Sequence, residues 1–227
     1  LFLMFKRFTT PLILYLAEKI SFYDHDLSHQ LAKKATHETI EFIEETNLNS
    51  MMKLPAKTRL YTMLNSRLKE GLILEFGVDA GKTINEIAKL FPNRTVYGFD
   101  TFTGLPEDWI TVPKGHFNHD GKLPEVESNV KLVKGLIEET LPSFKTSHTD
   151  NIALLHIDTD LYSSAKTILT ELQDQIQDTF IVFDEYWNFP NWKQEEYKAF
   201  TEFITETGKT FDYVSHNGNY AVLVKVH

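Results

Sequence analysis

The chain contains no cysteine among its 227 residues. A disulfide framework, a thiol nucleophile and a thiolate metal site are therefore excluded. Cysteine-free chains suit a reducing compartment, and we expect a cytoplasmic protein.

Clusters of basic residues are also absent, and the formal net charge is −9 at pH 7. Neutralising phosphates requires clustered Lys and Arg side chains, so we expect no nucleic-acid partner. A cationic small molecule is compatible with this charge. The chain is 42% hydrophobic and 24% charged, which is ordinary for a globular protein, and its length suits one α/β domain with an N-terminal extension.

Long apolar runs are missing as well. The segment 1–20 is apolar but is interrupted by Lys6, Arg7 and Pro11, so it falls short of the roughly 20 residues needed to span a bilayer. We expect no transmembrane segment. The apolar character of this segment is compatible with a homodimer formed through the N-terminal region.

The chain does contain a regular alternation of strand and helix patterns. Two helices are predicted first, over 28–47 and 55–70, and Gly71 ends the second. Strands are then predicted over 72–76, 95–99, 130–133, 152–157 and 180–183, and helices over 83–91, 137–144, 164–177 and 192–207.

Such apolar strands, separated by helices, imply a parallel sheet covered on both faces. Asn217-Gly218 between the runs 211–215 and 220–226 predicts a terminal hairpin. We therefore expect an α/β, Rossmann-like, mostly parallel seven-stranded sheet with helices on both faces, a C-terminal antiparallel hairpin and an N-terminal helical extension.

The turn after the first core strand is rich in glycine and carboxylates. Gly77 and Gly81 allow a tight turn and close approach of a ligand, although this spacing alone occurs in many turns. Glu75 and Asp79 would repel a pyrophosphate, and the third glycine of the dinucleotide fingerprint is missing. S-adenosylmethionine carries a sulfonium and an ammonium group and no phosphate, so the same turn favours it.

Asp100 follows the second core strand about 20 residues further on, where a carboxylate can accept both ribose hydroxyls. The alternative is that Asp100 caps the turn at 101–104.

Carboxylates also follow the fourth and fifth core strands. Asp158, Asp184 and Glu185 are distant in sequence, but the carboxyl ends of parallel strands share one crevice. Their mutual repulsion favours a hard divalent cation, Mg²⁺ before Ca²⁺. The alternative is that these acids cap helices or pair with Lys166 or Lys193.

The general base is open between two candidates. Asp158 can act both as a metal ligand and as a proton acceptor, and His116 lies in the long loop 101–129 that can cover the crevice. His156 precedes Asp158 in an apolar strand and reads as a core residue. The aromatic segment 186–192 either walls a substrate pocket, with Asn188 as a further oxygen ligand, or is a packed loop.

With these residues in place, the chain resembles the macrocin O-methyltransferase family, within the class I S-adenosylmethionine-dependent methyltransferases. Five segments carry the resemblance: LEFGVDAGKT (74–83), GFDTFTGLPE (98–107), VKGLIEETLP (133–142), HIDTDLY (156–162) and FDEY (183–186). The family pattern has Asp-Asp in the last segment, where this chain has Asp184-Glu185.

The resemblance implies an enzyme that methylates a hydroxyl of a sugar or secondary metabolite, with residues 71–227 as the methyltransferase domain and 1–70 as a helical cap. It implies S-adenosylmethionine at Glu75, Gly77, Gly81 and Asp100, with the turn at Gly135 and Leu136 near the adenine. Thr83 and Thr101, in the same segments, are further candidates. It also implies Mg²⁺ at Asp158, Asp184 and Glu185.

Three other interpretations remain open. The first is a methyltransferase that needs no metal and uses His116 or Asp158 as its only base. The second is a catalytically silent protein that binds S-adenosylmethionine. The third is an NAD-linked oxidoreductase, which the acidic glycine turn disfavours.

Overall fold

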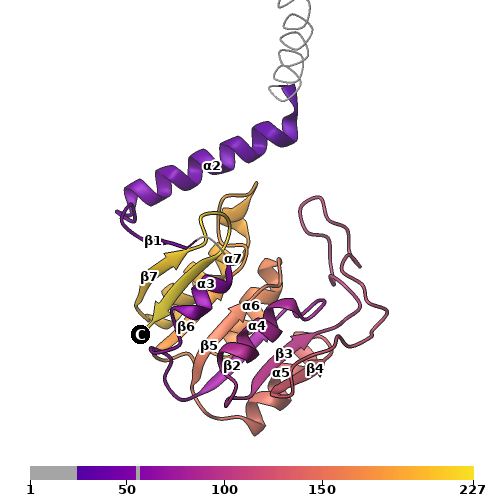
Figure 1. Ribbon diagram of the computed structural model, residues 1–227. Helices are drawn as coiled ribbons and strands as arrows, with labels where there is room; N and C mark the ends of the chain where they lie inside the picture. Colours follow the sequence, from indigo (N-terminus) through magenta and orange to yellow (C-terminus); the bar gives the residue numbers. More distant parts are fainter. Residues whose placement is uncertain (1–24, 55–56) are drawn as a thin grey trace, which may run out of the picture.

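The computed structural model describes residues 25–54 and 57–227 (Figure 1). The described helices are α2 (Leu27–Glu45), α3 (Lys57–Thr62), α4 (Lys82–Leu90), α5 (Ile137–Ser147), α6 (Tyr162–Glu171) and α7 (Glu196–Thr207), with a 3₁₀ turn, η1 (Trp192–Gln194). The strands are β1 (Met52–Lys53), β2 (Leu72–Phe76), β3 (Val96–Asp100), β4 (Val130–Lys134), β5 (Ile152–Ile157), β6 (Thr179–Phe183), β7 (Phe211–His216) and β8 (Val222–Val226).

The strands form one sheet in the order β1-β7-β8-β6-β5-β2-β3-β4. Strands β2 to β6 pair in parallel, and β8 runs antiparallel to both β6 and β7. The predicted mostly parallel sheet with a C-terminal antiparallel hairpin is therefore confirmed. β1 pairs with β7 as an additional edge strand, and its two residues are too few to leave a periodic pattern in the sequence.

Helices cover both faces of the sheet, as predicted. Figure 1 shows α3 and α4 in front of it, where Leu60 and Ile84 pack in one core with Ile73 of β2. The other core includes Phe144 of α5 and Phe200 of α7. Because side chains alternate along a strand, residues 73 and 75 of β2 share the α3/α4 face, as do residues 154 and 156 of β5.

Helix α2 docks through an aromatic side chain and two hydroxyls. The ring of Phe42 lies edge-on to those of Trp187 and Trp192, with centroids 6.3 and 5.7 Å apart. The hydroxyl of Thr39 accepts the backbone N–H of Asn188 at 3.0 Å, and Thr36 donates to the side-chain oxygen of Asn188 at 2.8 Å. The segment after β6 therefore anchors α2.

Helix ends differ from the predicted ones where the backbone takes a left-handed conformation or a turn. The helix predicted over 55–70 is shorter, since α3 ends at Thr62 and turns follow. Asn191, at φ 71°, separates the segment after β6 from η1, so α7 begins only at Glu196. The C-terminal end of α7 agrees with the prediction, because the helix ends at Thr207, before Gly208 at φ 68°.

The inferences drawn from segment 1–20 lie outside the described residues. Within the described part, no helix combines the length and apolar character that crossing a membrane requires.

Candidate active site

A cavity of about 430 Å³ opens where the parallel strands end. The turns after β2, β3, β4, β5 and β6 all contribute to its wall, together with the loop that follows β3. This is the crevice in which open α/β sheets bind their ligands. Its charged lining consists of one lysine, Lys82, and seven carboxylates: Asp79, Asp100, Glu138, Asp158, Asp160, Asp184 and Glu185.

Gly77 lets the ends of β2 and β5 approach each other closely. Its φ is +89°, and a Cβ at this position would lie 1.7 Å from the carbonyl oxygen of Asp158. The two segments are also tied directly, because the N–H of Asp158 donates to the carbonyl of Phe76 at 2.9 Å. A side chain at position 77 would therefore displace Asp158 from its place in the cavity wall.

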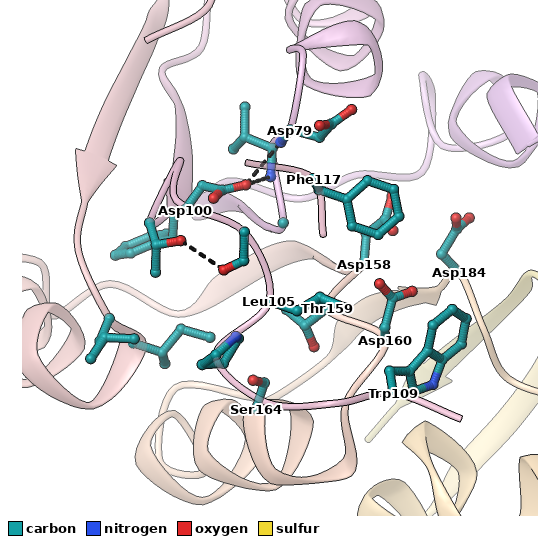
Figure 2. Close-up of a pocket in the computed structure, with 18 of the residues that line it drawn as sticks. Asp79, Asp100, Leu105, Trp109, Phe117, Asp158, Thr159, Asp160, Ser164 and Asp184 are labelled. Atoms are coloured by element: carbon teal, nitrogen blue, oxygen red, sulfur yellow. Dashed lines mark hydrogen bonds between the residues drawn. The ribbon is translucent and has the colours of Figure 1, made fainter. Parts of the chain in front are cut away.

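Asp100 holds the glycine turn in place. One carboxylate oxygen accepts the backbone N–H groups of Val78 and Asp79, each at 2.8 Å, as dashed lines show in Figure 2. The other accepts the N–H of Phe102 at 2.7 Å, so the predicted capping of the following turn is present. The carboxylate also lines the cavity, and its role toward a ribose stays a prediction.

The other predicted cofactor residues divide into two groups. Five line the cavity: Gly77, Thr83, Thr101, Gly135 and Leu136. Two do not. Gly81 takes a left-handed conformation at the start of α4, and Glu75 is fully buried behind the turn.

Glu75 has a specific partner. Its Oε1 lies 3.0 Å from Nδ1 of His156, which is also fully buried, as expected for a core histidine. The other ring nitrogen of His156 lies 3.8 Å from a carboxylate oxygen of Asp158. Glu75 thus reaches the site through His156, and its direct contact with a cofactor stays a prediction.

The carboxylates after β5 and β6 do come together. Figure 2 shows Asp158, Asp160 and Asp184 on one side of the cavity, across from Asp100. Asp158, Asp160 and Glu185 can each offer an oxygen within 4.8 Å of the others, and so can Asp158 and Asp184 together with a nitrogen of His156. Asp158 belongs to both groups, Asp184 to one and Glu185 to the other, and their role as metal ligands stays a prediction.

Two lysines are the predicted alternative partners of these acids. Lys166, in α6, contacts Glu206 at 2.7 Å and Glu202 at 3.2 Å, both in α7. Lys193 lies over the ring of Trp192, 5.2 Å from its centroid.

A further carboxylate, Glu196 at the start of α7, completes the cluster. It is fully buried, accepts the backbone N–H of Glu185 at 3.2 Å through Oε2, and has no hydrogen-bond partner for Oε1 among the described residues. Burial raises the pKa of Glu196 well above its usual range, and the charges of Asp158 and Asp184 raise it further. The same causes raise the pKa of Glu185. Without a cation, these two groups resist ionisation.

His116 and Asn188 lie away from this cluster. His116 is exposed in the loop after β3, with its ring against that of Phe117, and is not among the residues that line the cavity. Its role as a base stays a prediction. The side-chain oxygen of Asn188 accepts the Thr36 hydroxyl, so it serves the docking of α2.

Sequence reasoning missed Asp160, Glu196 and Trp109. Asp160 had a signal, since it stands two residues after Asp158 at the same strand end. Trp109 lines the cavity from the loop after β3, and its ring meets Phe189 edge-on at 6.0 Å. Nothing in the loop's sequence indicates which of its aromatic residues turns inward.

This fold, with an acidic cavity at the carboxyl edge of the sheet, is the arrangement expected of an S-adenosylmethionine-dependent methyltransferase. The family comparison agrees, because residues 122–214 match the macrocin-O-methyltransferase (TylF) family. The match includes three of the five segments that carry the resemblance, 133–142, 156–162 and 183–186. The sequence has no significant match among curated proteins.

Solved structures share the fold. CalS11, a calicheamicin methyltransferase, is 23% identical with a TM-score of 0.58, over 87% of this chain and 90% of that chain. Its apo form, described as a TDP-rhamnose 3'-O-methyltransferase, is 23% identical with a TM-score of 0.54, over 87% and 92%. An O-methyltransferase from Bacillus cereus in complex with SAH is 13% identical with a TM-score of 0.50, over 93% and 97%.

Proposed function

We propose that the protein is a Mg²⁺-assisted O-methyltransferase that transfers a methyl group from S-adenosylmethionine to a hydroxyl of a sugar or secondary metabolite. The observation that carries the proposal is that Asp158, Asp184 and Glu185 line the same cavity as the Gly77 turn and Asp100, which holds that turn. Residues 71–227 form the catalytic domain in this proposal, and residues 1–70 extend it.

The charge of the cavity supports the choice of methyl donor. Seven carboxylates against one lysine attract a sulfonium and an ammonium group and repel a diphosphate. Asp100 is held by three backbone N–H groups, which leaves about one of its four acceptor sites for a ligand in the cavity that it lines. We assign it to the ribose hydroxyls, with Gly135 and Leu136 beside the adenine.

The donor set fits a hard divalent cation. Asp158, Asp160 and Glu185 form a group that offers oxygen atoms only, as Mg²⁺ prefers, and Asp184 lies within reach of Asp158. The buried Oε1 of Glu196 adds a further carboxylate that the described residues leave without a hydrogen bond. When bound, the cation would supply Lewis-acid polarisation of the acceptor hydroxyl.

The protein's own residues orient the acceptor and receive its proton. Asp158 lies where the strand end, the glycine turn and the cavity meet, and its backbone is fixed by Phe76. We assign Asp158 as the acceptor of the hydroxyl proton, because His116 is exposed and does not line the cavity. Trp109 and Phe117 line the cavity beside this cluster and offer apolar surface to the acceptor (Figure 2).

The test is methyl transfer from labelled S-adenosylmethionine to a panel of glycosides and hydroxylated metabolites, before and after treatment with EDTA. We expect transfer that EDTA abolishes and Mg²⁺ restores. Full activity in EDTA would contradict the metal assignment. Calorimetric binding of S-adenosylmethionine without transfer to any acceptor would instead favour a silent binding protein.

A further inference from the structure

A tyrosine hydroxyl is buried without a hydrogen bond behind the carboxylate cluster. Tyr61, in α3, is 0% exposed, and its hydroxyl makes no hydrogen bond to any described residue. Its ring packs edge-on against the imidazole of His156, with centroids 5.6 Å apart. A buried hydroxyl without a partner opposes folding, so its presence here calls for a role other than stability.

The surroundings of this hydroxyl are acidic. Burial raises the pKa of Tyr61 well above its usual range, and the negative charges of Glu75, Asp184 and Asp158 raise it further. The hydroxyl is therefore protonated at neutral pH and available as a hydrogen-bond donor. Glu75 is engaged with His156, whereas Asp184 and Asp158 are carboxylates of the cluster proposed above.

We propose that Tyr61 is a positioning residue whose hydroxyl donates to Asp158 or Asp184, the two carboxylates grouped with its neighbour His156, when the cluster holds a divalent cation. The inference rests on the proposed function, because it assigns a hydrogen-bond donor to the carboxylates of the same proposed metal site. Carboxylates that bind a metal are themselves oriented by hydrogen bonds, and losing such an outer partner commonly weakens binding 10–100-fold. α3 would then complete the site instead of only covering the sheet.

The experiment compares the wild type with Tyr61→Phe, which keeps the ring and its contact with His156 and removes only the oxygen. Mn²⁺ is titrated into protein stripped with EDTA, and the free ion is measured by electron paramagnetic resonance. We expect the variant to bind Mn²⁺ about 10–100-fold more weakly. In metal-free protein its Tm should be unchanged or higher, since an unbonded buried hydroxyl is lost. S-adenosylhomocysteine affinity should not change, because Tyr61 does not line the cavity.

The matched control is Tyr213→Phe in β7. Its hydroxyl is hydrogen-bonded to that of Tyr186 at 2.7 Å, so this variant should lower Tm and leave Mn²⁺ affinity unchanged. Equal Mn²⁺ affinities of wild type and Tyr61→Phe would overturn the positioning role while leaving the metal site standing. A lower Tm of metal-free Tyr61→Phe would also overturn it. Absence of Mn²⁺ binding to the wild type would instead refute the metal assignment itself, and the inference with it.

Discussion

Replacing Gly77 with alanine probes the contact on which the site geometry depends. The new Cβ would lie 1.7 Å from the carbonyl oxygen of Asp158, whereas Cβ atoms are essentially never found under 3.0 Å from a neighbour. The two backbones must therefore separate by at least 3.0 − 1.7 = 1.3 Å. A displacement of about 1 Å in a catalytic group can cost about 100-fold in rate.

The energetic cost has two parts. The positive φ of +89° costs roughly 1–2 kcal/mol for alanine, and forcing apart two buried strand ends adds at least a similar amount. We expect a total of about 3 kcal/mol, which corresponds to a fall in Tm of about 6–12 °C for a chain of this size.

Gly208→Ala is the matched control, because Gly208 also has a positive φ, +68°, but no atom lies within 4 Å of the added Cβ. The free energy of unfolding of Gly208→Ala should fall by only about 1 kcal/mol, and this variant should keep its activity. Thermal denaturation and calorimetric titration with S-adenosylhomocysteine compare the two variants. If Gly77→Ala resembled Gly208→Ala in both measurements, the argument from close approach would be refuted.

Three further predictions follow from the same structure. Asp100→Ala should weaken S-adenosylhomocysteine binding at least about tenfold by calorimetry, because three backbone N–H groups lose their acceptor; unchanged affinity would contradict the assignment. The raised pKa of Glu196 contributes stability that is present below its unfolded value of 4.5 and is lost as the pH rises through the folded value. In EDTA, the Tm of the wild type should therefore fall as the pH rises above about 4.5. The fall should be smaller with Mg²⁺ and smaller in Glu196→Gln. A Tm that does not change with pH in EDTA, in Mg²⁺ and in the variant would contradict this prediction. Lys225 and Lys69 lower the pKa of Asp178 from 3.8 to about 2. Asp178→Asn should therefore lower the free energy of unfolding by about 1 kcal/mol at pH 7, a value discounted for the partial exposure of the side chain, and should have no effect below pH 2. Urea denaturation at the two pH values measures the difference.

The sheet and its helices follow from local patterns in the sequence. The run Ile152–Ile157 is apolar except for His156 because β5 is buried on both faces, and Asn217-Gly218 marks the turn between β7 and β8. Short elements leave no such pattern in the sequence. The two residues of β1 form a strand because they pair with β7, and no local sequence feature predicts this contact.

The site was predictable as far as strand ends determine it. Asp158 and Asp184 end neighbouring parallel strands, so their meeting follows from topology. Glu75 shows the limit of such reasoning, because alternation along β2 turns its side chain under α3 and α4, away from the cavity. Glu196 and Tyr61 belong to helices, and their approach to the cluster depends on how α7 and α3 pack on the sheet.

A crystal grown with S-adenosylhomocysteine and Mn²⁺, measured at the manganese absorption edge, tests the central claim most directly. The account predicts an anomalous peak coordinated by Asp158, Asp184 and Glu185, with the ribose of the ligand hydrogen-bonded to Asp100. An adenosyl group bound elsewhere, or no peak beside these carboxylates, would contradict it.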